Sequence, residues 1–116
     1  MSLDKELEKL TGAYCEDAPN DAAYPYKVFS ARRLSESEGK QSYILEINVW
    51  DQNTYYSRAQ SIMEQLEKEL HRCNYISEDY LIRIFKGQSE KVTDQDKDIK
   101  RVREQFEMYV YEREGQ

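Results

Sequence analysis

His71 and Cys73 are the side chains of this sequence with the clearest potential for nucleophilic chemistry. A histidine can activate a cysteine thiol when the two groups lie within hydrogen-bonding distance of each other. Here one residue separates them at the end of a predicted helix, and side chains at i and i+2 of a helix point apart. We therefore assign no catalytic residue to this pair.

Metal binding has no better support from residue spacing. The chain has a single histidine and two cysteines, Cys15 and Cys73, and neither cysteine belongs to a CxxC pair. A structural or catalytic metal ion needs three or four ligands in a suitable geometry. The N-terminal stretch Met1–Glu6 is charged and lacks the pattern of a signal peptide, so we expect reduced thiols. We predict no metal ion and no cofactor.

The many carboxylates of the chain alternate with lysine and arginine, which is typical of a solvated surface. General acid–base catalysis would need two of them in a cleft, one with a raised pKa. The four glycines are scattered, at positions 12, 39, 87 and 115, and form no phosphate-binding loop. We predict that the protein is not an enzyme. An enzymatic interpretation would need a cleft that encloses His71 together with carboxylates.

Composition argues against further classes of protein. A net charge of −6 and an isoelectric point near 4.9 argue against specific or general nucleic-acid binding, which depends on a basic surface. No apolar run is long enough to span a membrane. A chain of 116 residues fits one domain, and we take residues 1–116 as that domain. The ten tyrosines either fill a small core or serve protein–protein contacts.

The elements that would position any site are organised around the stretch Tyr43–Asp51. Leu45, Ile47 and Val49 share one face of an extended strand, because successive side chains of a strand alternate between its faces. The polar residues between them point towards water or a neighbouring subunit. We expect this strand in the middle of the sheet.

The rest of the chain predicts two helices, further strands and polar connections. We expect the fold class α+β: a mostly antiparallel four-stranded sheet with a long helix and a short N-terminal helix packed on one face. A short helix through Leu3, Leu7 and Leu10 is expected to end at Gly12, and a longer helix is expected at about Thr54–Arg72. The apolar stripe of the longer helix consists of Ala59, Ile62, Met63, Leu66 and Leu70. The other expected elements are a brief extended piece at Tyr14–Glu16, a turn at Asn74–Asp79, and strands at Tyr26–Arg32, Tyr80–Lys86 and Ile99–Glu112.

Two polar connections are long enough to contact a partner. The first, Arg33–Lys40, is predicted to be a hairpin loop or an extended hairpin tip. The second, Gln88–Asp98, is predicted to be a loop or a long hairpin tip in which acids and bases alternate. A solvated turn is the commoner role for such segments, and partner binding is the functional alternative.

Several stretches, in their order, resemble the small tail-completion, or tail-terminator, proteins of long-tailed bacteriophages and prophages. A loop with Ala18–Asn20 precedes Tyr24–Phe29, in which Pro-Tyr opens a strand, and Leu45–Asp51 ends a later strand in Trp-Asp. The helix that follows begins with Tyr56 and Arg58, which match the pattern of that family loosely. The resemblance covers most of the chain.

The resemblance implies a structural role in virion assembly. Proteins of that family form a ring, usually hexameric, that caps the head-proximal end of the tail tube and joins it to the head connector. The implied partners are further copies of the chain, the tail-tube protein and the head–tail connector, in the cytoplasm of the bacterial host and then in the virion tail. On this interpretation the candidate interface residues are Arg33, Glu36, Glu38, Lys40, Glu90, Lys91, Asp94, Asp96 and Lys97.

Two other interpretations stay open at this point. A different head–tail neck or joining protein could share a small fold of this class. An acidic inhibitor that mimics DNA belongs to another class of protein, although the 17 lysines and arginines would interrupt its negative surface.

Overall fold

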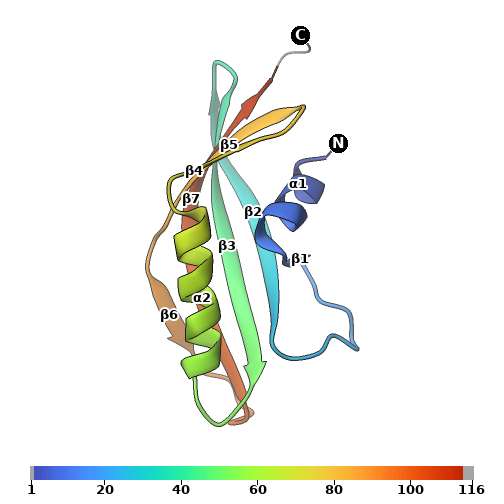
Figure 1. The fold of residues 1–116 in the computed structure, drawn as a ribbon, viewed down its shortest axis with the longest axis vertical. Helices are drawn as coiled ribbons and strands as arrows, with labels where there is room; N and C mark the ends of the chain where they lie inside the picture. The colour runs from blue at the N-terminus through green and yellow to red at the C-terminus, as the bar shows by residue number, and fades with distance from the viewer. Residues whose placement is uncertain (1, 114–116) are drawn as a thin grey trace.

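Strands dominate the fold and occupy 49% of residues 2–113, which are the residues that the computed structural model describes. The long strands run along most of the molecule, which measures 51 × 27 × 22 Å along its principal axes (Figure 1). The elements are α1 (Leu3–Thr11), β1 (Tyr14–Cys15), β2 (Tyr26–Ser37), β3 (Lys40–Gln52), α2 (Ser57–Leu70), β4 (Cys73–Ile76), β5 (Tyr80–Phe85), β6 (Ser89–Val92) and β7 (Ile99–Glu112).

The strands form one curled sheet in the order β1-β2-β3-β7-β5-β4, with β6 also paired to β7. Neighbours are antiparallel except β1 and β2, which are parallel, so the sheet is mixed. β5 and β6 share one edge of β7, where Phe85 lies opposite Glu107 and Ser89 lies opposite Glu104. Residues 86–88 therefore interrupt what would otherwise be a single strand.

The expected α+β fold, with a mostly antiparallel four-stranded sheet and a long helix, is wrong. The structure is mostly β, with a curled mixed half-barrel of six to seven strands and two short helices. The expected turn Asn74–Asp79 contains most of β4, and the expected connection Gln88–Asp98 contains β6. Neither short strand has buried apolar side chains, so its extended shape comes from pairing with a longer strand. The helix expected at Thr54–Arg72 is shorter, because Tyr56 and His71 are its caps.

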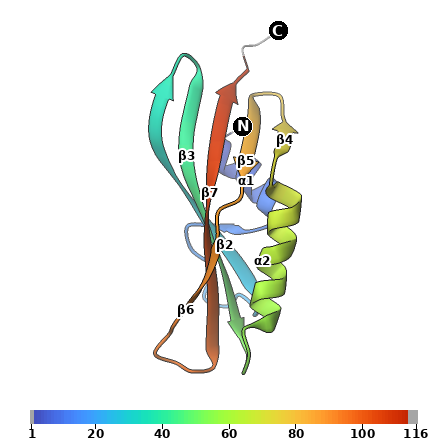
Figure 2. The same ribbon diagram turned by 90° about the vertical axis from the view of Figure 1, so that its left-hand side faces the viewer.

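The hydrophobic core lies on the inner face of the sheet, which α2 covers (Figure 2). Leu45, Ile47 and Val49 are fully buried on that face, which confirms the face predicted for the central strand. Ile62 of the predicted helical stripe is only half-buried. The rest of the stripe is buried with residues of β5 and β7: Ala59, Met63, Leu66 and Leu70 with Ile82, Ile84, Val102, Phe106, Met108 and Val110.

The short helix α1 connects two strands that lie far apart in the sheet order. It leads directly into β1, and the Tyr75 hydroxyl on β4 donates a hydrogen bond to Glu6 Oε2 at 2.6 Å. Leu7 is fully buried. Ser2 caps the first turn, and Gly12 ends the helix in the left-handed conformation with φ 67°, as the sequence predicted. The helix therefore closes the open side of the curl.

Candidate interaction surfaces

The β2–β3 hairpin carries the first group of predicted interface residues. Its turn is Glu38–Gly39, and both residues have positive φ, 46° and 81°, as a two-residue hairpin turn of type I′ requires. Arg33 and Glu36 lie on β2, Lys40 begins β3, and all three side chains are exposed. This segment is therefore an extended hairpin tip, one of the two forms that the sequence predicted.

The segment after β5 carries the second group. Glu90 and Lys91 lie on β6, and Arg103 Nε donates a hydrogen bond to Glu90 Oε1 at 2.8 Å. The connection to β7 holds Asp94, Asp96 and Lys97. Both aspartates accept a hydrogen bond, each of 2.9 Å, from the backbone amide two residues later. Such bonds order the connection locally.

The structure places these two groups at opposite ends of the molecule. The β2–β3 turn lies at the top of Figure 1 and the β6–β7 connection at the bottom, along a longest dimension of 51 Å. We call residues 33–40 the hairpin end and residues 90–97 the connection end. They form two separate surfaces and not one composite site.

The outer face of the sheet, opposite α2, carries an aromatic row that the sequence did not predict. Tyr26, Trp50 and Arg101 lie opposite one another on β2, β3 and β7. The Arg101 guanidinium lies 4.8 Å from the Trp50 ring centroid, and its Nε donates to Asn48 Oδ1 at 2.8 Å. Tyr24 packs on Tyr26 with ring centroids 5.2 Å apart. Tryptophan, tyrosine and arginine are the residues most enriched at the energetic centres of protein–protein interfaces.

Asp51 and Arg58, which both lie in the stretches that carry the family resemblance, meet between β3 and α2. Asp51 is fully buried, whereas the Arg58 side chain is 50% exposed. Hydrogen bonds from Arg58 hold the pKa of Asp51 below its ordinary value, so this carboxylate is ionised at neutral pH. The pair anchors the start of α2 to the sheet.

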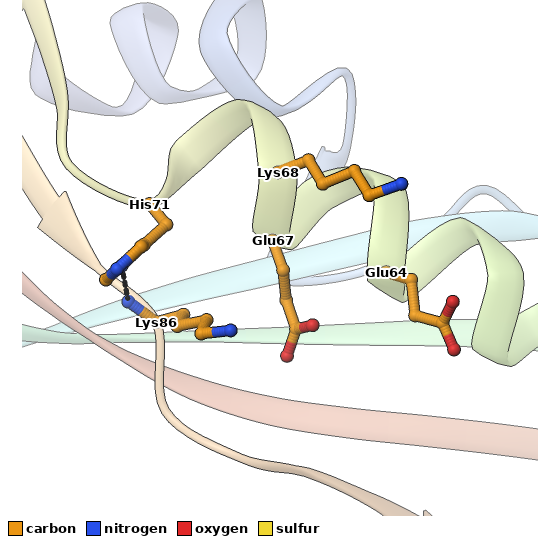
Figure 3. Close-up of a pocket in the computed structure, with 5 residues that line it drawn as sticks. All are labelled: Glu64, Glu67, Lys68, His71 and Lys86. Carbon is orange, nitrogen blue, oxygen red and sulfur yellow. Dashed lines mark hydrogen bonds between the residues drawn. The ribbon is translucent and has the colours of Figure 1, made fainter.

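A cleft of about 430 Å³ opens beside the C-terminal half of α2 (Figure 3). It is lined by Glu64, Glu67, Lys68, His71 and Lys86. The backbone N–H of Lys86 donates to His71 Nδ1 at 3.1 Å. The structure therefore places His71 in a cleft with carboxylates, which is the arrangement that an enzymatic interpretation needed.

The thiol nearest to His71 in the sequence is not part of that cleft. Cys73 is absent from its lining, and burial raises the pKa of the Cys73 thiol, which keeps it protonated at neutral pH. Nδ1 of His71 already accepts a backbone hydrogen bond. The cleft therefore holds no activated histidine–cysteine pair.

Glu104 lies under α2 beside this cleft and is 1% exposed. Its Oε2 accepts a hydrogen bond from the Gly87 N–H at 3.0 Å. The pKa of Glu104 is raised to about 8, first by burial and then by the hydrogen bond that its protonated form shares with Glu67 and by the Glu67 charge. Glu104 was not among the residues predicted from the sequence, although its position is in phase with the apolar residues of β7.

The structure also bears on metal binding, on the state of the cysteines and on membrane-spanning helices. Within residues 2–113, no group of three or more histidine, cysteine, aspartate or glutamate side chains could hold a metal ion. Cys15 and Cys73 are free thiols. Over the same part of the chain, no helix combines the length and the apolar character needed to cross a membrane.

Comparison with known proteins identifies relatives of the chain. Residues 2–111 match the family described as tail completion protein gp17. Among solved structures, the chain is similar to one from the virion of a native gene transfer agent particle, with a TM-score of 0.67 and 17% identity over 94% of this chain and 87% of that one. At this identity the likeness shows a shared fold. No curated protein matches the chain.

Proposed function

The chain belongs to the tail completion protein gp17 family, and from that membership we propose how it acts in the tail. Members of this family are structural proteins of tail and virion assembly, so the role of the chain is structural and not catalytic. We propose that copies of the chain, each a single domain over residues 1–116, close into a ring. The ring caps the tail tube and joins it to the head connector.

The observation that carries this proposal is the separation of the two charged surfaces along an elongated molecule (Figure 1). A subunit that joins two different partners needs two contact surfaces that do not compete for the same space. The hairpin end and the connection end both expose charges of each sign. In the proposed ring, one end contacts the tail tube and the other contacts the head connector.

Closure of a ring requires heterologous contacts, in which one patch of a subunit meets a different patch of the next. We assign the row Tyr26–Trp50–Arg101 to one side of that contact, because the two aromatic rings can bury a large apolar area and all three residue types are enriched at the energetic centres of interfaces. The net charge of −6 suits a ring through which DNA passes, because like charges repel.

Light scattering on a sizing column, over a range of protein and salt concentrations, tests the ring. We expect a closed species of about six subunits, as the resemblance implies. A stable dimer at every concentration would contradict the proposal, because a two-fold contact does not build a ring on a tail tube.

Charge reversal tests the two ends separately. We expect the pair Glu36→Lys and Glu38→Lys to impair contact with one partner, and the pair Asp94→Lys and Asp96→Lys to impair contact with the other. Electron microscopy would score capped tails and joined heads separately. Glu69→Lys, at an exposed position of α2, is the matched control. Normal tails and normal joining in both double variants would show that the ends are wrongly assigned.

A further inference from the structure

Glu104 occupies an inward-facing position of β7 and has apolar neighbours on β7 and β3. Val102 and Phe106, its neighbours on the same face, are buried, and Ile47 lies opposite it on β3. Glu104 itself is 1% exposed. A carboxylate in such surroundings loses its hydration, which favours the protonated acid.

Groups from α2, from the junction between β5 and β6, and from β6 itself lie around this carboxyl. From α2, Glu67 brings a second carboxyl group. From the junction between β5 and β6, Gly87 donates its N–H, and the charge of Lys86 partly offsets the effect of burial. Ser89 lies opposite Glu104 on β6. The remaining titratable groups around Glu67 line the cleft of Figure 3 and are Glu64, Lys68 and His71.

The contact between the two acids lacks a hydrogen-bond donor when both are ionised. Glu104 Oε1 is buried and meets no donor in the part of the chain that the structure describes. Ionised carboxylates only accept hydrogen bonds, so a proton on one of the two groups would supply the missing donor. Burial and the neighbouring Glu67 raise the pKa of Glu104 to about 8, which keeps such a proton bound at neutral pH.

We propose that Glu104 and Glu67 share one proton across the contact between β7 and α2, and that its loss in mildly alkaline solution loosens the C-terminal half of α2. When the proton leaves to solvent, two carboxylates face each other across this contact, and the positive charge of Lys86 offsets their repulsion only in part. Their repulsion acts directly between the helix and the central part of the sheet. The shared proton is a property of the single subunit, so this proposal goes beyond the capping role and does not depend on the oligomeric state.

The Gly87 amide is a direct reporter for the proposed proton, because it donates to Glu104 Oε2 at 3.0 Å. In the full chain, we expect the proton and nitrogen NMR shifts of this amide to titrate with a midpoint near 8. Glu67→Gln should lower the midpoint by about one pH unit or more, because it removes a charge and offers a donor. Glu64→Gln, at an acid of the same cleft, should leave the midpoint unchanged.

Hydrogen exchange tests the loosening of the helix. Protection of the α2 amides from Leu66 to Leu70 should fall above the midpoint in the wild-type chain and should stay constant in Glu104→Gln. Constant protection in the wild-type chain would overturn the conformational part of the proposal. A Gly87 signal that does not titrate, or equal midpoints for the wild-type chain and Glu67→Gln, would overturn the shared proton. These two titrations decide the question even if Glu104→Gln does not fold.

Discussion

Arg58 forms a two-pronged ion pair with Asp51, in which Nε lies 2.9 Å from Oδ2 and Nη2 lies 2.5 Å from Oδ1. Asn53 adds a further hydrogen bond to Oδ2 at 3.4 Å. The first turn of α2 has no side-chain cap, since Tyr56 occupies the N-cap position. The ion pair therefore provides the polar link that ties the start of α2 to the end of β3.

Replacing Arg58 with alanine should destabilise the fold by about 2 kcal/mol, because the buried Asp51 carboxylate would lose its charged partner. The exposure of Arg58 keeps this cost below that of a fully buried pair. Arg58→Lys retains the charge without the two-pronged geometry and should have an intermediate effect. Urea unfolding measures the change, with Lys68→Ala on the same helix as the control. Equal midpoints for Arg58→Ala and Lys68→Ala would refute the assigned role.

Acid should weaken the same pair. The hydrogen bonds from Arg58 lower the pKa of Asp51 in the folded state below its ordinary value of 3.8. The stabilisation from Asp51 is therefore present above that ordinary value and is lost as the pH falls through the folded pKa. We expect the stability difference between the wild-type chain and Asp51→Asn to shrink as the pH falls below the ordinary value of 3.8. A difference that stays constant as the pH falls would speak against an ionised Asp51.

Gly87 lets the junction between β5 and β6 approach β7 closely. A Cβ at this position would lie 2.2 Å from the carbonyl oxygen of Gln105, so the backbone would have to move. We expect Gly87→Ala to destabilise the fold by roughly 2 kcal/mol. At Gly39 nothing lies within 4 Å of an added Cβ, and φ is +81°. Gly39→Ala should therefore cost only about 1 kcal/mol, for its backbone conformation.

Thermal unfolding of the two glycine variants makes this comparison. A larger loss for Gly39→Ala than for Gly87→Ala would mean that the junction adjusts without strain.

Glu104 should make stability depend on pH in the opposite sense to Asp51. The pKa of Glu104 rises from 4.5 to about 8 on folding, so the folded state retains a proton that the unfolded state has lost. The stabilisation from the protonated acid is complete below the unfolded pKa of 4.5 and is lost as the pH rises through the folded pKa. Between these two pKa values, the free energy of unfolding of Glu104→Gln relative to the wild-type chain should increase by up to about 1.4 kcal/mol per pH unit.

Denaturant midpoints at several pH values measure that gain. An offset between Glu104→Gln and the wild-type chain that does not change with pH would contradict a folded state with a protonated Glu104.

Trp50→Ala should weaken self-association and leave the subunit folded, because the ring lies on the outer face and not in the core. Loss of a central aromatic contact weakens an interface by about tenfold or more. Sedimentation equilibrium measures the association constant. Tyr55→Ala is the matched control, since that ring is 70% exposed outside the row. Equal association of both variants would exclude the row from the subunit contact.

The family and the faces of the long elements could be predicted from the sequence. Alternation in Tyr43–Asp51 placed Leu45, Ile47 and Val49 on the buried face, because a side chain's face depends only on its position in the strand. Helical spacing identified most of the buried stripe of α2 in the same way. The motif order led to the family that the match over residues 2–111 bears out.

The predicted interface residues keep the status of a prediction. Their charges and turn chemistry indicated exposed segments, which is where the structure places them. Which partner each end contacts is part of the proposal for the ring. The aromatic row was not predicted, because its members come from three strands and meet only through the strand register.

By itself, the sequence determined local properties: the buried faces of the long strands, the cap at Gly12 and the overall negative charge. Only the tertiary structure decided the curl of the sheet, the short strands β4 and β6, the placement of the two charged ends, and the contacts of Asp51 with Arg58 and of Glu104 with Glu67. The physical reason is that periodicity and capping act within one helix or strand. Short strands and buried charges are instead stabilised by partners on other elements, and only the tertiary structure brings those elements together.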